Sequence, residues 1–338
     1  LHFLMPRVLR FASAVFAAVL LTQCAIGPAG RTPGPRSHRL ASLGYESLPL
    51  KKSTGDSRYS GRFRVNGKEV RFLIDSGANS TDLDYELATS FGITPEKSVK
   101  VVSRGALGRP VTSWVGLGAL GAGHVTATPF PFMLAQPTKR HTATSRYDGQ
   151  VGLDALSGLA ALVDLQAGKL WIPGPQAGNA QRDGIRALGR HKGLGFDSLR
   201  LETAGRLPHL LVKCRYQGKR LTWVVDTGAE VTVMAAATVQ RLAIPTTASR
   251  SKIIDASGDR ASVRNAVLHN VVFGQLVVSE FQVAVTPLAT IRRTFRDRSG
   301  RPVDGIIGMD FLEESSALLD SASKVLYLGD PPRSRLMN

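Results

Sequence analysis

The chain has 338 residues, of which 43% are hydrophobic, so it is long enough for one large domain or two ordinary domains with packed cores. Its 34 Gly and 18 Pro residues indicate many turns, as in an all-β protein. The net charge of +17 would suit a nucleic-acid binder, but the basic residues are mostly Arg, spread along the whole length without interleaved aromatic residues. We therefore expect no nucleic-acid partner. The charge indicates a solvated basic surface, or contact with anionic lipid or envelope polymers.

The N-terminal segment has the pattern of an export signal. Arg7 and Arg10 precede residues 11–21, an apolar run that is too short to span a bilayer. The following Leu21-Thr22-Gln23-Cys24 resembles a bacterial lipoprotein box, except that Gln23 stands where that box prefers a small residue. Residues 1–24 are thus expected to be a signal peptide, with three outcomes open: lipidation of Cys24, simple secretion, or an uncleaved anchor. Each outcome predicts the cell envelope of a bacterium, with the protein periplasmic or lipid-anchored to a membrane.

From residue 43 onward the chain is an internal duplication. Asp75-Ser76-Gly77-Ala78 matches Asp226-Thr227-Gly228-Ala229, a spacing of 151 residues from Asp75 to Asp226. A later block, 148–154, matches 304–310 at a spacing of 156, so the second half has five more residues between the blocks. In chain order, the sequence predicts a tether at 25–42, an N-terminal lobe at 43–174, a linker at 175–192, a C-terminal lobe at 193–330 and a tail at 331–338.

Both lobes are expected to be mostly β. Asn66-Gly67, a strong hairpin signal, lies between two apolar alternating runs, and Gln217-Gly218 repeats that turn in the second lobe. A further hairpin is expected over 267–285. Short helices are expected at Asp82–Phe91, at Ala235–Leu242, and directly after Gly152 and after Gly308. Cys214 lies in an apolar stretch and is expected to be a buried, inert thiol.

The matched motifs each place a carboxylate directly after an apolar run. Phe72-Leu73-Ile74 precedes Asp75, and Trp223-Val224-Val225 precedes Asp226. A carboxylate at the end of a buried strand is unfavourable unless its charge is used or hydrogen-bonded. The next residues, Ser76 and Thr227, carry hydroxyls that can bond across to the partner loop. The glycines that follow allow the tight turn that presents the carboxylate.

This paired motif resembles the aspartic peptidases of the pepsin and retroviral-protease superfamily. In that family each lobe has an apolar-apolar-Asp-Thr/Ser-Gly motif and, later, an apolar-apolar-Gly element. The later elements here are Gln150-Val151-Gly152, where Gln150 departs from the pattern, and Ile306-Ile307-Gly308. Ala78 and Ala229 follow the retropepsin form of the motif. The chain therefore looks like a bacterial single-chain, tandem-duplicated retropepsin. The resemblance implies an all-β, bilobal acid-protease fold with two homologous β-barrel-like lobes, short helices and the active site between the lobes.

The resemblance also implies an aspartic endopeptidase that cleaves extended polypeptides with a water activated between Asp75 and Asp226. The residues expected to support this pair are Ser76, Gly77, Thr227, Gly228, Gly152 and Gly308. Two carboxylates close together retain one proton, so one can act as general base and the other as general acid, and no metal or other cofactor is needed. The duplication supplies both carboxylates, so a monomer is sufficient. The alternative is a catalytically silent peptide-binding or sensor protein of the envelope.

Several further segments carry weaker expectations. Ser103–Ser113 and Asp255–Ala261 are candidate flaps, the hairpins that cover the substrate in this family. Gly116–Gly121 spells a dinucleotide-binding glycine pattern, but no helix follows it, so no nucleotide site is expected. Asp154 and Asp310 are expected to cap the helices that follow the glycine elements. A second-lobe arginine cluster indicates either a solvated loop or a site that attracts acidic substrates or anionic lipid; it comprises Arg292, Arg293, Arg296, Arg298 and Arg301.

Overall fold

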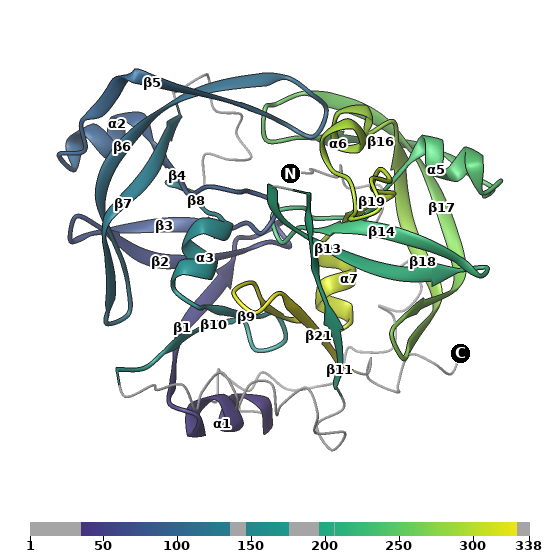
Figure 1. Ribbon diagram of the computed structural model, residues 1–338, viewed down its shortest axis with the longest axis horizontal. Coiled ribbons are helices and arrows are strands. Elements are labelled where there is room, and N and C mark those ends of the chain that lie inside the picture. Colours follow the sequence, from purple (N-terminus) through teal and green to yellow (C-terminus); the bar gives the residue numbers. More distant parts are fainter. Residues whose placement is uncertain (1–34, 136–146, 176–195, 206, 330–338) are drawn as a thin grey trace, which may run out of the picture.

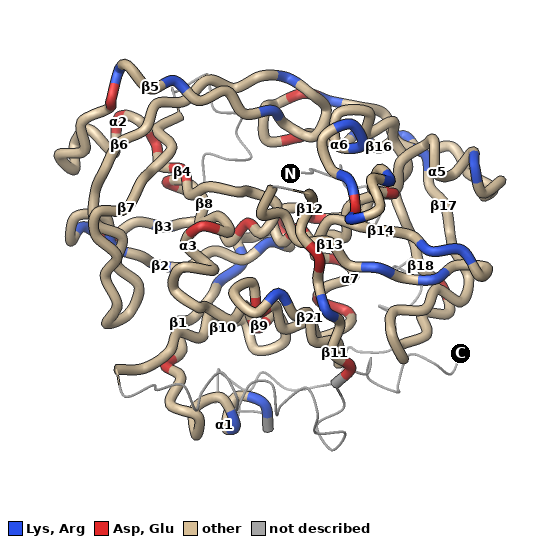
Figure 2. The backbone as a smooth tube through the Cα atoms, in the orientation of Figure 1, with Lys and Arg blue, Asp and Glu red and all other residues tan. Residues whose placement is uncertain are grey.

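The computed structural model describes residues 35–135, 147–175, 196–205 and 207–329. Figure 1 shows two lobes side by side, the first in purple to teal and the second in green to yellow, with helix α1 at the bottom of the view. Lys and Arg residues are distributed over both lobes in Figure 2, as the sequence indicates. No helix among the described residues is long and apolar enough to cross a membrane.

The described part of the first lobe contains a closed ring of six strands. Its order is β2-β3-β8-β4-β7-β6, and β6 pairs back onto β2 through Arg64↔Gly121 and Val65↔Leu120. The ring strands are β2 (Tyr59–Val65), β3 (Lys68–Ile74), β4 (Asp82–Asp84), β6 (Pro110–Ala122), β7 (Val125–Ala135) and β8 (Gly149–Val151). Strand β5 (Pro95–Arg104) pairs with β6 outside the ring.

The second lobe repeats this ring. Its order is β13-β14-β19-β15-β18-β17, and the closing pair Arg215↔Val272 is the repeat equivalent of Arg64↔Gly121. The ring strands are β13 (Leu207–Tyr216), β14 (Lys219–Val225), β15 (Val233–Ala235), β17 (Arg260–Phe273), β18 (Leu276–Thr286) and β19 (Gly305–Ile307). Strands β12 (Glu202–Ala204) and β16 (Thr247–Ile254) pair at its edges.

A shared sheet joins the two lobes. Its strands are β1 (Tyr45–Lys52), β10 (Lys169–Pro173), β9 (Leu162–Asp164), β20 (Leu318–Asp320), β21 (Val325–Gly329) and β11 (Phe196–Arg200), in that spatial order. At its centre β9 pairs with its own repeat equivalent, β20, through Leu162↔Asp320, Val163↔Leu319 and Asp164↔Leu318. A strand that pairs antiparallel with its own copy has a local two-fold axis, here between Val163 and Leu319. The duplicated halves are thus related by a pseudo-two-fold axis, and the predicted bilobal all-β fold is confirmed.

The predicted turns and helices are found with small shifts. Asn66 and Gly67 both have positive φ angles, 49° and 81°, as do Gln217 and Gly218, 49° and 73°, which is the backbone that a two-residue hairpin requires. The helices of the lobes are α2 (Tyr85–Ser90), α3 (Leu153–Gly158), α5 (Ala236–Arg241), α6 (Ala289–Thr294) and α7 (Met309–Glu314). Residues 82–84, expected to be helical, form β4 instead, and Asp84 caps α2 by accepting a bond from Leu87 N.

The prediction of a tether over 25–42 is wrong for its last eight residues, which form helix α1 (Pro35–Ser42). Leu40 is fully buried, and Arg36 is 5% exposed because its guanidinium binds both lobes. Arg36 Nη1 donates to Asp164 Oδ1 at 2.9 Å, and Nη2 donates to the carbonyl of Ser316 at 2.8 Å. Composition alone suggested a solvated segment, whereas one buried ion pair and one leucine fix it to the shared sheet.

Other predictions fall on residues that the structure does not describe. The signal peptide with Cys24, the first ten residues of the tether, nearly all of the linker at 175–192 and the tail at 331–338 lie outside the described residues. Lipidation and envelope location therefore stay predictions.

Replacing Arg36 with Ala tests the attachment of α1. The change leaves the Asp164 carboxylate without its guanidinium partner in a buried site, so we expect the free energy of unfolding to fall by about 3 kcal/mol. Arg39→Ala, an exposed change on the same helix, is the control and should cost less than about 0.5 kcal/mol. Urea denaturation measures both, and equal midpoints for the two variants would contradict the assigned role.

Candidate active site

Two equivalent loops, one at the end of β3 and one at the end of β14, bring Asp75 and Asp226 to the lobe interface. Each loop leaves its strand alongside the glycine element of the same lobe. Asp75 N donates to Val151 O and Asp226 N donates to Ile307 O, both at 3.0 Å. The flanking parallel pairs are Ile74↔Val151 and Val225↔Ile307. The aspartates are therefore presented by the ends of buried strands and are themselves 1% and 0% exposed.

The hydroxyls of Ser76 and Thr227 interlock the two loops. Ser76 N donates to Thr227 Oγ1 at 2.9 Å, and Thr227 N donates to Ser76 Oγ at 3.0 Å. Each hydroxyl then donates into the opposite lobe, Ser76 to Val225 O and Thr227 to Ile74 O, both at 2.9 Å. These four bonds are buried and obey the pseudo-two-fold axis. The structure thus brings together the two hydroxyls in the arrangement that the sequence predicted.

The glycine after each hydroxyl lies against the opposite carboxylate. A Cβ at Gly77 would overlap the carboxylate of Asp226, and a Cβ at Gly228 would overlap that of Asp75. The amides of these glycines bond within their own loops, Gly77 N to Asp75 Oδ1 and Gly228 N to Asp226 Oδ1, both at 2.8 Å. Only glycine fits at these two positions, because any side chain would occupy the space of the carboxylate.

The closeness of the two carboxylates changes their acid–base chemistry. Burial, the repulsion from Asp75 and a side-chain hydrogen bond with Asp75 raise the pKa of Asp226 to about 7. The pair therefore holds one proton over the range where an ordinary aspartate is ionised. One acid and one base are then available at the same place, which suits the activation of a water and the protonation of a carbonyl oxygen.

Gly152 and Gly308 allow the glycine elements to pass close to the loops. A Cβ at Gly152 would lie 2.6 Å from the backbone of Ser80, and a Cβ at Gly308 would lie 2.5 Å from the backbone of Val231. Neither position has room for a side chain. These glycines support the site through backbone packing and do not contact the carboxylates in any way that the structure records.

Asp154 and Asp310 bind the first turn of their helices, α3 and α7, in agreement with the predicted capping role. Ala155 N donates to Asp154 Oδ1 at 2.7 Å, and Phe311 N donates to Asp310 Oδ1 at 2.8 Å. Asp154 also accepts bonds from Thr81 N at 2.9 Å and Thr81 Oγ1 at 2.7 Å, and Asp310 accepts the same two bonds from Thr232. Each aspartate therefore joins its helix to the end of the catalytic loop, a second contact that the sequence did not predict.

Two hairpins, one from each lobe, contact each other at the segments predicted to be flaps. Their tips are 105–109, between β5 and β6, and 255–259, between β16 and β17. Asp255 in the second tip accepts a bond from Leu107 N in the first at 2.8 Å. Gly105 is the equivalent of Asp255 in the first tip, because the carbonyl of each accepts a bond from the glycine three residues later. Gly105 makes room for the contact between the tips, since a Cβ there would overlap the Asp255 carboxylate. The tips therefore fit together through unlike residues at equivalent positions.

The sequence did not predict one ion pair that joins the two lobes near the catalytic loops. Arg58 lies 3.6 Å, Nε to Oε1, from Glu230, four residues after Asp226. Arg58 is 1% exposed and also binds Asp56, whose pKa stays below its usual value despite burial because of that partner. A charged residue just before an apolar strand is an ordinary surface pattern, so the sequence carried no signal for this contact.

Packing accounts for two further features of the sequence. Gly116–Gly121 lies within strand β6, where a Cβ at Gly116 or Gly118 would press on the buried Ile93, so these glycines let the strand pack closely on the core. Cys214 is buried as expected, and burial raises its pKa to about 12. Among the described residues, no group of three or more His, Cys, Asp or Glu side chains is placed to hold a metal ion.

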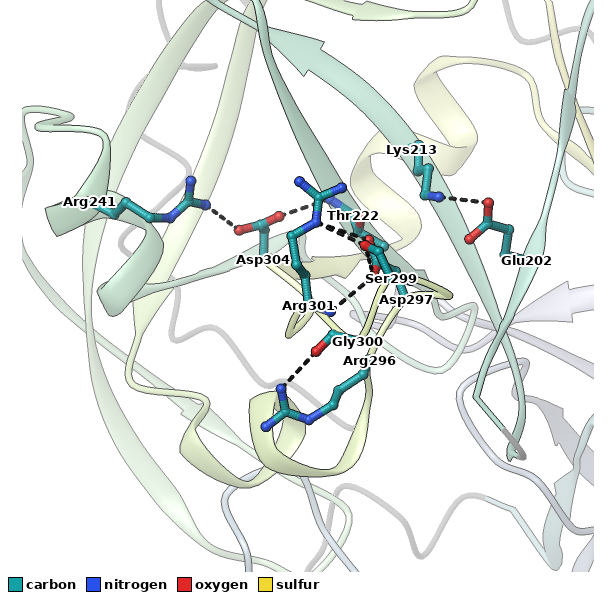
Figure 3. Close-up of polar contacts among 10 residues, drawn as sticks. All are labelled: Glu202, Lys213, Thr222, Arg241, Arg296, Asp297, Ser299, Gly300, Arg301 and Asp304. Atoms are coloured by element: carbon teal, nitrogen blue, oxygen red, sulfur yellow. Dashed lines mark hydrogen bonds and ion pairs between the residues drawn. The ribbon is translucent and has the colours of Figure 1, made fainter.

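The second-lobe arginines are largely engaged within their own segment. Figure 3 shows Arg301 directed to Ser299 and Asp297, and Arg296 directed to the carbonyl of Gly300. In the same view Arg241 binds Asp304, whose other oxygen accepts a bond from Thr222 N. These contacts favour the solvated-loop interpretation of the cluster over a ligand site.

Comparison with known proteins agrees with this geometry. A family model described as "Aspartyl protease" matches residues 62–155 and 212–311, one match in each lobe. The mouse protein named "Protein DDI1 homolog 2" is 25% identical over 128 residues, which is 38% of this chain and 29% of that protein, so the chain spans less than a third of that relative's length.

Two solved structures are similar to this chain at low sequence identity. Conglutin gamma from lupine seeds has a TM-score of 0.50 at 11% identity, covering 85% of this chain and 95% of that one. Basic 7S globulin from soybean has a TM-score of 0.47 at 12% identity, with the same coverages.

Replacing Thr227 with Val tests the interlock without relying on activity. The change keeps the shape but removes the acceptor for Ser76 N and the donor for Ile74 O, so we expect a loss of about 2–4 kcal/mol in the free energy of unfolding. Thr247→Val, at an exposed strand position, is the control and should change stability by less than about 0.5 kcal/mol. Chemical denaturation decides, and a Thr227→Val protein as stable as the wild type would show that the interlock contributes nothing.

Proposed function

Because this chain belongs to the aspartyl protease family, we propose that it is an aspartic endopeptidase that hydrolyses extended polypeptides with a water held between Asp75 and Asp226. The observation that carries the proposal is the placement of the two carboxylates. Each is buried, and each lies against the glycine of the opposite catalytic loop. A protein that had only kept the fold would not need both carboxylates in this costly position.

The reaction follows from the shared proton. The ionised carboxylate removes a proton from the water as the water attacks the scissile carbonyl carbon, and the protonated carboxylate donates to the carbonyl oxygen. The carboxylate that took the proton from the water then donates it to the leaving nitrogen as the C–N bond breaks. The proton on the former carbonyl oxygen returns to the other carboxylate, so the pair again holds one proton. The chain needs no covalent intermediate for this step, and both acids come from one chain, so a monomer is sufficient.

The flap tips support an extended substrate. They meet from both lobes, and Ala106 of the first tip is buried against apolar residues of the second lobe. A peptide between flaps and carboxylates can hydrogen-bond through its backbone as an added strand. The Asp255–Leu107 contact must open to admit it.

We propose an envelope location and anchoring through Cys24 on the sequence pattern alone.

Carboxylate-to-amide substitutions test the proposal. Asp75→Asn and Asp226→Asn each remove the acid or the base, so we expect kcat/KM on a random peptide library to fall by about 10²–10⁴-fold. Glu280→Gln, the same chemical change at an exposed position of β18, should leave activity unchanged. Statine-type inhibitors should block the wild type. Equal cleavage by all variants would show that the two aspartates do not carry the activity, and no cleavage by the wild type would favour the silent binding protein instead.

A stability measurement confirms that the variants fold. The pKa of Asp226 is raised in the folded state, so its stabilising contribution is complete below the unfolded value of about 3.8 and is lost as the pH rises through about 7. Asn cannot ionise, so at pH 8 Asp226→Asn should resist denaturant at least as well as the wild type.

The pH dependence of cleavage is expected to have an upper limit near neutrality. The reaction needs one proton on the pair, and the raised pKa of about 7 at Asp226 retains that proton up to that pH. The rate should therefore decline above about pH 7 and peak well above pH 3, since Ala78 and Ala229 provide no hydroxyl to stabilise the ionised pair. Initial rates from pH 3 to 9 measure this, and a maximum below pH 3 contradicts it.

A further inference from the structure

Arg58 and His209 occupy equivalent positions in the two repeats, and each reaches across to the other lobe. Arg58 approaches Glu230 with 3.6 Å between Nε and Oε1, whereas His209 Nε2 lies 3.1 Å from the carbonyl oxygen of Gly77. Both side chains are buried, at 1% and 7% exposure. His209 therefore contacts the catalytic loop itself, at the residue between Asp75 and the opposite carboxylate.

The surroundings of the two residues differ in charge. Arg58 is held by the carboxylate of Asp56 at 2.8 Å, and Tyr147 donates to the same carboxylate at 2.7 Å. The repeat equivalents of Asp56 and Tyr147 are Leu207 and Val303, both part of an apolar cluster. The ring of His209 packs on Phe295, 4.1 Å between ring centroids. Arg58 thus has a carboxylate bonded to its guanidinium, whereas the ring of His209 bonds to a neutral carbonyl.

The hydrogen bond determines the tautomer of His209. A carbonyl oxygen only accepts, so Nε2 carries the proton and donates to Gly77 O. Nδ1 is buried and has no hydrogen-bond partner among the described residues. A proton added at Nδ1 would create a buried cation with an unpaired N–H, which an apolar site disfavours.

Gly77 lies between the His209 ring and the two carboxylates, so a movement of the ring affects both Asp75 and Asp226. Its amide donates to Asp75 Oδ1, and its Cα lies so close to Asp226 that a Cβ would overlap that carboxylate. A shift of the Gly77 peptide therefore moves one carboxylate and opens space at the other. Misplacement of reacting groups by about 1 Å can lower a rate by about 10²-fold.

We propose that His209 is a positioning residue for peptide hydrolysis: its neutral ring fixes the Gly77 peptide across the lobe interface. Protonation at Nδ1 at acidic pH creates a buried cation that leaves this apolar site, and the departing ring takes the donor away from Gly77 and inactivates the enzyme. This inference rests on the proposed peptidase function. According to this proposal, the loss of activity at low pH is caused by protonation of His209, which lies outside the carboxylate pair.

The electrostatic surroundings agree with such a limit. Burial lowers the pKa of His209 to about 4, although the bond to Gly77 and the charge of Asp75 act in the opposite direction. The charged side chains around Phe295 are bound elsewhere: Arg292 to Thr238, Arg296 to Gly300, and Asp297 to Ser299. Asp75 is the acid whose charge acts on the ring, and the ring is neutral near pH 7.

Two substitutions separate the hydrogen bond from the titration. The amide of His209→Gln can donate to Gly77 O but cannot be protonated, so kcat/KM at pH 6 should stay within about threefold of the wild type while the decline at low pH shifts down or disappears. His209→Phe fits beside Phe295 without a donor, so kcat should fall by about tenfold to 100-fold with KM within about twofold. His269→Gln, at an exposed position of β17, should change neither.

The result that overturns the proposal is wild-type kcat in His209→Phe, or an unchanged acid limit in His209→Gln. Nitrogen-15 NMR of the ring gives an independent readout that needs no activity and no variant. An Nε2–H tautomer that titrates below pH 5 supports the proposal, and an Nδ1–H tautomer or a pKa near 6.5 overturns it. If the wild type cleaves no peptide, the peptidase function fails, while the ring shifts still decide whether His209 is held as described.

Discussion

The reciprocal bonds between Ser76 and Thr227 are the interaction on which the rest of the site depends. Each hydroxyl accepts from the other loop's amide and donates to a strand carbonyl of the other lobe, so the loops cannot move apart without breaking four buried bonds. Two carboxylates that repel each other are held together only because this neutral framework surrounds them. Burial, together with that enforced closeness to Asp75, raises the pKa of Asp226, so that the pair retains a shared proton.

The duplication keeps its backbone symmetry and loses its side-chain symmetry where the lobes meet. The ring closures and the central strand pair follow the repeat. At the interface, however, Arg58 is matched by His209, and Gly105 of one flap tip is matched by Asp255 of the other. A single chain can assign different residues to the two copies of one position, which a symmetric dimer of identical chains cannot. Complementary pairs such as Gly105 with Asp255 follow from that freedom.

Much of the fold could be predicted because the signals were local or repeated. The Asn66-Gly67 turn, the apolar runs before the aspartates and the repeat itself need no tertiary knowledge. The errors arose where a residue's partner is distant in the sequence. Helix α1 was mistaken for a tether because the partners of Arg36, Asp164 and Ser316, lie more than a hundred residues away. Asp154 binds its own helix as predicted, but its bonds from Thr81, 73 residues earlier, were missed.

The sequence by itself determined that two equivalent acids follow two equivalent buried strands, since the identity and spacing of the motif residues are written in the repeat. Only the tertiary structure decided what surrounds those acids: the ion pair of Arg58 with Glu230, the bond of His209 to Gly77, and the contact between the flap tips. The reason is physical. A hydrogen bond or an ion pair acts over about 3–4 Å in space, and the sequence sets distances only along the chain, so contacts between lobes depend on how the two barrels dock.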